Sequence, residues 1–356
     1  MSVNLPETPL SKRDTVLRIR NLRTCFPSEE GEVAAVNDVS LTLKRGQVLA
    51  VVGESGCGKS VTSNSILRLI RPPGRIAGGE IMYYPSEGAP YDVLKLPDKS
   101  DKLYDLRGGA ISMIFQEPMT ALSPVHTVGN QIIEAIRLHQ KVSKKEAREM
   151  TLKMLREVGI PGAERRIDQF PHELSGGMRQ RVVIAMALVC NPEVLIADEP
   201  TTALDVSIQA QILKLIKALQ RARNASVLFI THDLGVVAQV ADEVAVMYMG
   251  RVIETGSVRE VLKQPKHPYT RGLLNSLPGM DKVRGVRLSV IRGSVPALTS
   301  IPPGCPFHPR CDYAVRGICN VGVAPEMVYS AGAGAAACLR LDSIPTYGAK
   351  VKEVTP

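Results

Sequence analysis

The sequence predicts an α/β fold in which a mainly parallel sheet follows an antiparallel β-layer. Between residues 48 and 247, short apolar runs of strand length alternate with stretches of helical character, which is the pattern of parallel strands joined by helices. The apolar run 48–52 leads into the stretch 53–60, which reads G-x-x-x-x-G-K-S, and a helix-compatible run follows at 61–69. A chain of 356 residues exceeds the usual size of one domain, so we expect a large domain with a smaller one attached.

Each residue type in the stretch 53–60 suits a phosphate-binding loop. The glycines allow backbone angles and close approach that a Cβ would block, so the loop amides can surround phosphate oxygens. Lys59 supplies a positive charge for the β- and γ-phosphates. Ser60 offers a hydroxyl to Mg²⁺ at the start of a helix whose positive end faces the anion. An ordinary glycine-rich turn is the alternative, and the flanking strand and helix argue against it. The sequence therefore predicts that the protein binds a nucleoside triphosphate.

Composition and charge narrow the class of protein. The formal net charge of +9 is read first as a solvated surface, with a nucleic-acid surface or the anionic face of a membrane as alternatives. The longest apolar run, 182–190, is about half of the ~18 residues needed to span a bilayer, and residues 1–12 lack the apolar core of a signal peptide. We expect a cytoplasmic chain, soluble or bound peripherally to a partner. The seven cysteines then form no disulfide framework.

The N-terminal region has the pattern of an antiparallel layer. Residues 1–14 read as a flexible lead, and strands are expected at 16–20, 33–36 and 39–43. Phe26 has two interpretations of equal weight, which are core packing and a stacking platform for the nucleotide base.

Beyond the phosphate loop, a strand is expected at 76–84, a surface excursion at 85–101 and a short buried strand at 111–115. Gln116 closes this last strand. A Gln amide there can hydrogen-bond both a metal-bound water and a neighbouring loop, although alone it indicates nothing. Residues 127–170 have helical periodicity with charged opposite faces.

A second candidate anion site lies at 174–181. Ser175 is suited to cap the helix predicted at 182–190, and Gly176 and Gly177 leave backbone amides free at that helix end. The simpler interpretation is a cap with a flexible lead-in. The sharper one is that this site serves a nucleotide held by another subunit.

Two carboxylates, Asp198 and Glu199, end the buried strand expected at 194–198. An Asp at the end of a strand can hold Mg²⁺ through water, and the adjacent Glu can orient and polarise a water for attack on the γ-phosphate. An acidic turn is the alternative, which the upstream phosphate loop disfavours.

His232 follows the next buried strand, 227–230, after a helix expected at 208–222. A lone His is more often structural, but at the strand edge where α/β folds bind ligands it suits a sensor of the γ-phosphate. A strand pair is expected at 244–247 and 251–254.

This order of motifs resembles the nucleotide-binding subunits of ATP-binding cassette (ABC) transporters, over about residues 15–270. Residues 53–60 correspond to Walker A, and 194–199 to Walker B with its catalytic glutamate. The resemblance implies a P-loop NTPase domain at 15–262, with a RecA-like core, an antiparallel β-subdomain and a helical signature subdomain at about 120–185. The other matching motifs are the Q-loop at Gln116, the signature at 174–180, the D-loop at 203–205 and the switch histidine at His232.

The same resemblance implies the roles of individual residues. Ser60, Gln116 and Asp198 would serve Mg²⁺, while Glu199 would activate water and His232 would stabilise the γ-phosphate, with Gln116 also part of the catalytic set. The residues implied in nucleotide binding are Phe26, Gly53, Ser55, Gly56, Cys57, Gly58, Lys59, Ser60, Val61, Gln116, Asp198, Ser175, Gly176, Gly177 and Asp205.

The last part of the chain, 263–356, points to a subfamily. Residues 266–274 look like the segment that follows the core in importers of oligopeptides, dipeptides and nickel. Four cysteines then follow with the spacing C-x5-C-x7-C-x18-C. Free thiols and a metal site both remain open from the residues alone, because structural zinc usually begins with C-x2–4-C whereas four thiolates can hold an iron–sulfur cluster.

Similar tails in dipeptide-importer ATPases carry a [4Fe–4S] cluster. The resemblance therefore implies such a cluster here, and zinc with His308 in place of one thiol is the alternative. The implied cluster ligands are Cys305, Cys311, Cys319 and Cys338, while Cys25, Cys57 and Cys190 are read as small packing residues.

The resemblance implies an ATPase that powers the import of di- or oligopeptides from the cytoplasmic face of a bacterial inner membrane. Its partners would be a paralogous ATPase or a second copy, two transmembrane permease subunits and a periplasmic or lipid-anchored solute-binding protein. The ATPases of this family dimerise head to tail, so Ser175 and Gly177 would contact the ATP of the opposing subunit. Nickel, glutathione or an oligosaccharide is the alternative solute.

A non-transport ABC ATPase acting on nucleic acid or the ribosome is the second hypothesis. Translation-type members usually carry two cassettes in one chain, and repair-type members carry a long coiled-coil insertion. This sequence has one set of motifs and no such insertion, so we expect no nucleic-acid partner.

Overall fold

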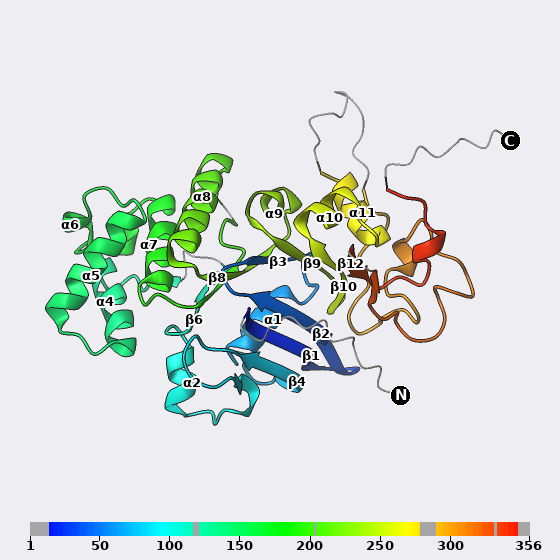
Figure 1. Cartoon of the computed structure of the whole chain (residues 1–356), viewed down its shortest axis with the longest axis horizontal. Coiled ribbons are helices and arrows are strands. Elements are labelled where there is room, and N and C mark those ends of the chain that lie inside the picture. The colour runs from blue at the N-terminus through cyan, green and yellow to red at the C-terminus, as the bar shows by residue number, and fades with distance from the viewer. Residues whose placement is uncertain (1–13, 117–120, 203, 278–289, 331–332, 348–356) are drawn as a thin grey trace.

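The computed structural model describes residues 14–116, 121–202, 204–277, 290–330 and 333–347. Most of the flexible lead expected at 1–14 lies outside these residues. In Figure 1 a central sheet separates a helical lobe on the left, which spans residues 128–188, from the C-terminal region on the right, and a second sheet lies below. No helix among the described residues is both long enough and apolar enough to cross a membrane.

The predicted antiparallel layer is present as a sheet with the order β2-β1-β4-β5. Two of the short strands expected from the sequence, 33–36 and 39–43, are one continuous strand, and that expectation was wrong. Asp38 adopts a positive φ of 62°, and the pairing register shifts near it, so a bulge rather than a turn absorbs this polar residue. The strands are β1 (Thr15–Ser28), β2 (Gly31–Lys44), β4 (Arg75–Tyr83) and β5 (Tyr91–Asp92).

The core sheet confirms the predicted α/β fold with a mainly parallel sheet. Its order is β11-β12-β10-β9-β3-β8-β7-β6, and the pairings from β9 to β6 are all parallel. Every residue of β3, β7 and β8 is buried, as expected for strands covered on both faces. The strands from β9 to β6 are β9 (Glu243–Tyr248), β3 (Val48–Val52), β8 (Ser226–Thr231), β7 (Val194–Asp198) and β6 (Ile111–Ile114).

The carboxyl ends of β3, β7 and β8 meet at one edge of this sheet. Val52 pairs with Thr231, and Asp198 pairs with Ile230. The phosphate loop, the acidic pair and His232 therefore leave the sheet side by side, which is where open α/β sheets bind ligands.

The helices differ from the sequence-based expectation mainly at their starts. The helix expected at 182–190 begins at Gly176, because Ser175 caps it and the buried side chains of Gln180 and Val182 anchor its first two turns. Tertiary packing here outweighs the poor helix propensity of two glycines. The helices are α1 (Lys59–Ile66), α2 (Asp101–Leu106), α4 (Val128–His139), α5 (Lys144–Glu157), α6 (Ala163–Arg166), α7 (Gly176–Leu188), α8 (Val206–Arg223), α9 (Leu234–Val240), α10 (Val258–Lys263) and α11 (Pro268–Asn275).

The stretch 85–101 is more ordered than a surface excursion. It contains β5 and a short 3-10 helix, η1 (Val93–Lys95), in which Val93 is fully buried. The side chain of Asp92 accepts a hydrogen bond from the amide of Leu94 and caps this turn. The Pro, Ser, Asp and Gly residues that suggested a loop surround a small apolar anchor.

The C-terminal region joins the core sheet instead of standing beside it. β10 (Arg251–Ser257) runs antiparallel to β9, and the hairpin of β11 (Val328–Ser330) and β12 (Ala333–Ala336) pairs with β10. A Cβ at Gly334 would lie 1.9 Å from the Thr255 carbonyl oxygen, so the hairpin docks through backbone contact. The remaining 3-10 helices are η2 (Pro171–Glu173), η3 (His308–Arg310) and η4 (Leu341–Ser343).

Candidate nucleotide site

The phosphate loop, 53–58, connects β3 to α1 and requires glycine at two positions. A Cβ at Gly53 would lie 2.2 Å from the Met247 carbonyl oxygen. Gly58 has a φ of 99°, and a Cβ there would lie 2.3 Å from the Ala35 carbonyl oxygen. The loop is thus pressed between the end of β9 and strand β2, and its backbone has little freedom to move toward either side.

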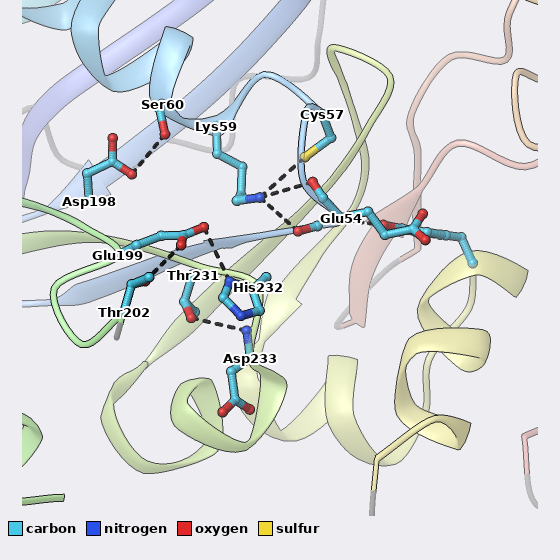
Figure 2. A network of polar contacts seen from close by, with 12 residues as sticks. Glu54, Cys57, Lys59, Ser60, Asp198, Glu199, Thr202, Thr231, His232 and Asp233 are labelled. Atoms are coloured by element: carbon cyan, nitrogen blue, oxygen red, sulfur yellow. Dashed lines mark hydrogen bonds and ion pairs between the residues drawn. The ribbon is translucent and has the colours of Figure 1, made fainter. Parts of the chain in front are cut away.

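Lys59 points back into this loop. Its Nζ donates hydrogen bonds to the carbonyl oxygens of Gly53 (2.8 Å) and Glu54 (3.1 Å), and the residue is only 5% exposed (Figure 2). Cys57 lies 3.8 Å from the same ammonium, and burial raises the pKa of its thiol. The loop therefore holds a buried cation against its own carbonyl oxygens, and a positive charge at this place suits a polyphosphate.

Asp198 is held by two hydroxyls of α1. Ser60 Oγ donates to its Oδ1 (3.0 Å), and Ser63 Oγ donates to its Oδ2 (3.1 Å). Burial raises the pKa of Asp198, and these two hydrogen bonds oppose the rise. A hydroxyl and a carboxylate in contact are hard oxygen ligands, so these residues fit Mg²⁺, which keeps several waters and takes few protein ligands. Ser63 was not anticipated, although it follows Ser60 by three residues and so shares its helix face.

Glu199 and His232 lie together at the same edge (Figure 2). His232 Nδ1 is 3.3 Å from Glu199 Oε1, and the other carboxylate oxygen accepts a hydrogen bond from Thr202 Oγ1 (2.9 Å). Glu199 adopts a positive φ of 46°, a conformation that costs a non-glycine residue on the order of 1 kcal/mol. The Glu199 side chain is 12% exposed whereas that of His232 is 60% exposed. The pair therefore combines a fixed, largely buried carboxylate with an accessible imidazole.

Other predicted site residues lie apart from this edge. Ser175 caps α7 through the amide of Met178, and Asp205 caps α8 through the amide of Ile208. Both are exposed, and no hydrogen bond among the described residues joins them to the phosphate loop. Figure 1 shows α7 within the helical lobe, away from α1. The residue expected at the start of the D-loop, 203, lies outside the described residues.

Gln116 and Phe26 also lie outside the group of site residues at the sheet edge. Gln116 is exposed two residues beyond the end of β6. Phe26 is half-buried in β1, and a Cβ at Gly74 would lie 2.4 Å from its ring. Its ring therefore packs on the backbone of Gly74 along part of its surface and stays partly open to solvent.

The four C-terminal cysteines face one pocket. Cys305, Cys311, Cys319 and Cys338 all line it. Burial raises the pKa of Cys305 to about 12 and that of Cys311 to about 11, and the neighbouring thiols add to both shifts. Among the described residues, no three His, Cys, Asp or Glu side chains are arranged to hold a single metal ion.

Backbone amides point at two of these sulfurs. The amide of Val315 donates to Cys319 Sγ and the amide of Arg340 donates to Cys338 Sγ, both at 3.4 Å. Outside the pocket, Cys25 and Cys57 are buried, and Cys190 is half-buried with its Sγ 3.6 Å from the Ala135 carbonyl oxygen. None of these three cysteines lines the pocket of the four C-terminal cysteines.

Comparison with known proteins identifies two family regions in the chain. Residues 36–202 match the ABC transporter family, and residues 253–319 match the C-terminal region of oligopeptide/dipeptide transporters.

Three curated relatives show the extent of the likeness. A putative peptide import ATP-binding protein of Brucella ovis is 51% identical over 319 residues, 88% of this chain and 94% of the relative. The dipeptide transport ATP-binding protein DppD of Bacillus subtilis is 54% identical over 84% of this chain and 87% of its own length. The oligopeptide transport ATP-binding protein OppD of Salmonella typhimurium is 49% identical over 86% and 89%.

Solved structures agree on the fold. A dimeric ATP-binding cassette in a post-hydrolysis state, bound to ADP and Pi, superposes with a TM-score of 0.59 at 28% identity, covering 68% of this chain and 99% of that one. The cbiO1 protein of Clostridium perfringens superposes with a TM-score of 0.57 at 30% identity over 70% and 90%. The chain therefore belongs to the ABC transporter family, among the ATP-hydrolysing subunits that carry the oligopeptide/dipeptide transporter C-terminal region.

Proposed function

We propose that this chain hydrolyses ATP to power the import of di- or oligopeptides through an ABC transporter. The relatives that support this are named for peptide, dipeptide and oligopeptide transport, and the match includes the C-terminal region as well as the ATPase core. The observation that carries the hydrolytic part is the convergence of Lys59, Asp198 and the Glu199–His232 pair at one sheet edge.

The proposed division of labour follows from where each group lies. Lys59 and the loop amides bind the β- and γ-phosphates, while Ser60 and Asp198, together with Gln116, would hold Mg²⁺. A Mg²⁺ ion held there would supply positive charge against the phosphate oxygens. These residues therefore position the phosphate groups and the metal ion before any bond is broken.

Glu199 orients the attacking water, because its carboxylate is fixed by Thr202 on one oxygen and faces His232 with the other. The His232 side chain is 60% exposed, so it is accessible to a γ-phosphate, to which it would donate a hydrogen bond. Phe26 stacks on the adenine with the open part of its ring.

We also propose a head-to-tail dimer with composite sites. Ser175, Gly176, Gly177 and Asp205 are free to serve the nucleotide of the opposing subunit because they are exposed or half-exposed and stand away from the phosphate loop of their own chain. The partner is a paralogous ATPase or a second copy of this chain. Two permease subunits and a solute-binding protein complete the transporter, which places this chain at the cytoplasmic face of the inner membrane, with no nucleic acid involved.

The C-terminal pocket is proposed to hold a [4Fe–4S] cluster. In a cluster each thiolate binds a different iron, and the four thiols that line this pocket supply the number of ligands that a cluster takes. Amides that donate to Cys319 and Cys338 would stabilise thiolate charge there.

Anaerobic purification with an absorption spectrum and iron, sulfide and zinc analysis tests the cluster. About four irons and four sulfides per chain with a broad visible band are expected. Stoichiometric zinc, or neither metal, would overturn it.

Reconstitution tests the transport proposal. The chain is assembled in proteoliposomes with its membrane subunits and binding protein, and ATP hydrolysis is followed while candidate solutes are added. Di- or oligopeptides should raise the rate, and Glu199→Gln should abolish the response. A response only to nickel, glutathione or an oligosaccharide would remove the peptide assignment, whereas stimulation by nucleic acid in the absence of membrane subunits would favour a non-transport ATPase.

A further inference from the structure

Glu54 of the phosphate loop contacts the C-terminal region through two of its groups. Its carboxylate accepts two hydrogen bonds from the guanidinium of Arg310, at 2.7 and 3.0 Å, and its backbone amide donates to the hydroxyl oxygen of Tyr269 at 2.9 Å. Arg310 and Tyr269 stand 256 and 215 residues further along the chain. The loop is thus tied to a region that lies outside the nucleotide-binding core.

Arg310 is well placed to hold the carboxylate rigidly. Its side chain is 5% exposed, its Nε donates to the Arg292 carbonyl oxygen, and its guanidinium lies 5.9 and 6.0 Å from the ring centres of Tyr248 and Phe307. The hydrogen bonds to Glu54 are the largest cause of its raised pKa. A planar, bidentate fork of this kind fixes orientation as well as charge, which a Lys cannot do.

Tyr269 is held just as firmly. Its ring packs 4.8 Å from that of Tyr248 and 5.4 Å from that of Phe307, so the hydroxyl cannot follow a moving loop. The residue is fully buried. The amide of Glu54 is consequently committed to the Tyr269 hydroxyl in the C-terminal region.

The third group of Glu54 faces the nucleotide side. Its carbonyl oxygen, together with that of Gly53, accepts from Lys59 Nζ, and in Figure 2 Glu54 and Asp198 lie on opposite sides of Lys59. One residue therefore joins Arg310 and Tyr269 to the cation of the ATP site. A shift of the Glu54 backbone would move the carbonyl oxygens that set the position of this ammonium.

We propose that Arg310 and Tyr269 are positioning residues of the ATP site, through which the C-terminal region holds residues 53 and 54 in the conformation that places Lys59. Neither residue touches ATP. The proposal concerns ATP affinity and depends on the family assignment alone, not on the transported solute or on any metal at the cysteine pocket.

The test measures equilibrium MgATP binding and steady-state hydrolysis in the full-length chain carrying Arg310→Met, Arg310→Lys or Glu54→Gln. Met keeps the length and the packing of the aliphatic stem while removing the fork. We expect Arg310→Met to weaken MgATP binding and to raise KM about tenfold, with a smaller change in kcat. A tenfold change in affinity is about what the loss of one hydrogen bond to a charged group causes. Arg310→Lys should recover part of the loss. Arg316→Met, an exposed arginine of the same region, is the matched control and should change neither.

A double-mutant cycle separates positioning from folding. Arg310→Met should add little to Glu54→Gln, because both remove the same contact. If Arg310→Met fails to fold, Tyr269→Phe keeps the ring and removes only the hydroxyl acceptor, and it should raise KM about threefold. Additive effects, or a lowered melting temperature with unchanged MgATP affinity, would reduce the contact to ordinary stabilisation and overturn the proposal.

Discussion

Two bidentate arginine–carboxylate pairs of nearly equal geometry lie in different regions of the molecule. Arg148 of α5 binds Asp168 in the helical lobe with hydrogen bonds of 2.9 and 2.8 Å, and Arg310 binds Glu54 with bonds of 2.7 and 3.0 Å. The first pair is 43% and 63% exposed, the second 5% and 29%. Geometry alone therefore does not separate a surface pair from a contact that supports a site.

The surroundings explain the difference. Around Arg148 and Asp168, water competes for both charges and salt screens them, so the pair contributes little. Around Arg310, aromatic rings exclude water and the partner carboxylate sits in the phosphate loop itself. A buried pair of this kind matters mainly when one partner is removed, because the other is left without compensation.

Removing the ammonium of the phosphate loop should have the largest effect. In Lys59→Ala, MgATP binding is expected to fall at least about a hundredfold, because the buried cation that we propose binds the phosphates is lost. Equilibrium binding of a fluorescent ATP analogue measures this. The loss of MgATP affinity in Lys59→Ala is the largest loss expected for any variant that acts through Lys59. An Arg310 variant that binds MgATP more weakly than Lys59→Ala would contradict the comparison.

Removing the proposed base should separate chemistry from affinity. Glu199→Gln is expected to lower kcat by roughly 10²–10⁴ while keeping MgATP binding and favouring a closed dimer. Single-turnover hydrolysis and size-exclusion chromatography with ATP provide the measurement. Normal turnover would exclude Glu199 as the general base. Arg310 variants, like Lys59→Ala, should mainly weaken MgATP binding, and they should not lower kcat as Glu199→Gln does.

The two arginines should differ in stability as well. Arg310→Met is expected to cost about 3 kcal/mol of unfolding free energy, because it leaves Glu54 partly buried and unpaired. Arg148→Met should cost less than about 1 kcal/mol. Urea unfolding of both variants, followed by circular dichroism, measures the difference. Equal losses would show that burial does not distinguish the pairs.

The smallest effect concerns pH and salt at the exposed pair. Hydrogen bonds from Arg148 lower the pKa of Asp168 below its usual value near 3.8. The contribution of the pair is thus present above the unfolded-state pKa and is lost as pH falls through the lower folded-state pKa. Asp168→Asn should cost a few tenths of a kcal/mol at pH 7 and low salt, and less at pH 3 or in 1 M salt. Urea midpoints with and without salt test this, and a salt-independent cost would refute it.

Much of the nucleotide site was predictable because its residues follow strand ends. The apolar runs before Gly53, Glu199 and His232 identify buried parallel strands, and the carboxyl ends of such strands meet at one edge. The roles assigned to these residues remain predictions, as does the division of the chain at residue 262. The confirmed α/β fold rests on the same apolar runs.

Local irregularities were harder to predict. Residues 33–36 and 39–43, expected as two strands, form one strand with a bulge at Asp38, where φ is positive. Helix α7, capped by Ser175, begins six residues before the apolar run. Thr202 and Ser63 support Glu199 and Asp198 through side-chain contacts that leave no distinctive pattern in the sequence. The sequence alone does not show whether a Thr or a Ser faces water or a carboxylate of the site.

The parallel core, the phosphate loop and the charges along the sheet edge can be predicted from the sequence, because each depends on residues close in the chain or on strand periodicity. The contacts of Glu54 with Arg310 and Tyr269, and the extension of the core sheet by the C-terminal hairpin, become visible only in the folded chain. The two contacts of Glu54 join segments more than 200 residues apart. Their register follows from the packing of the whole chain, which no local pattern encodes.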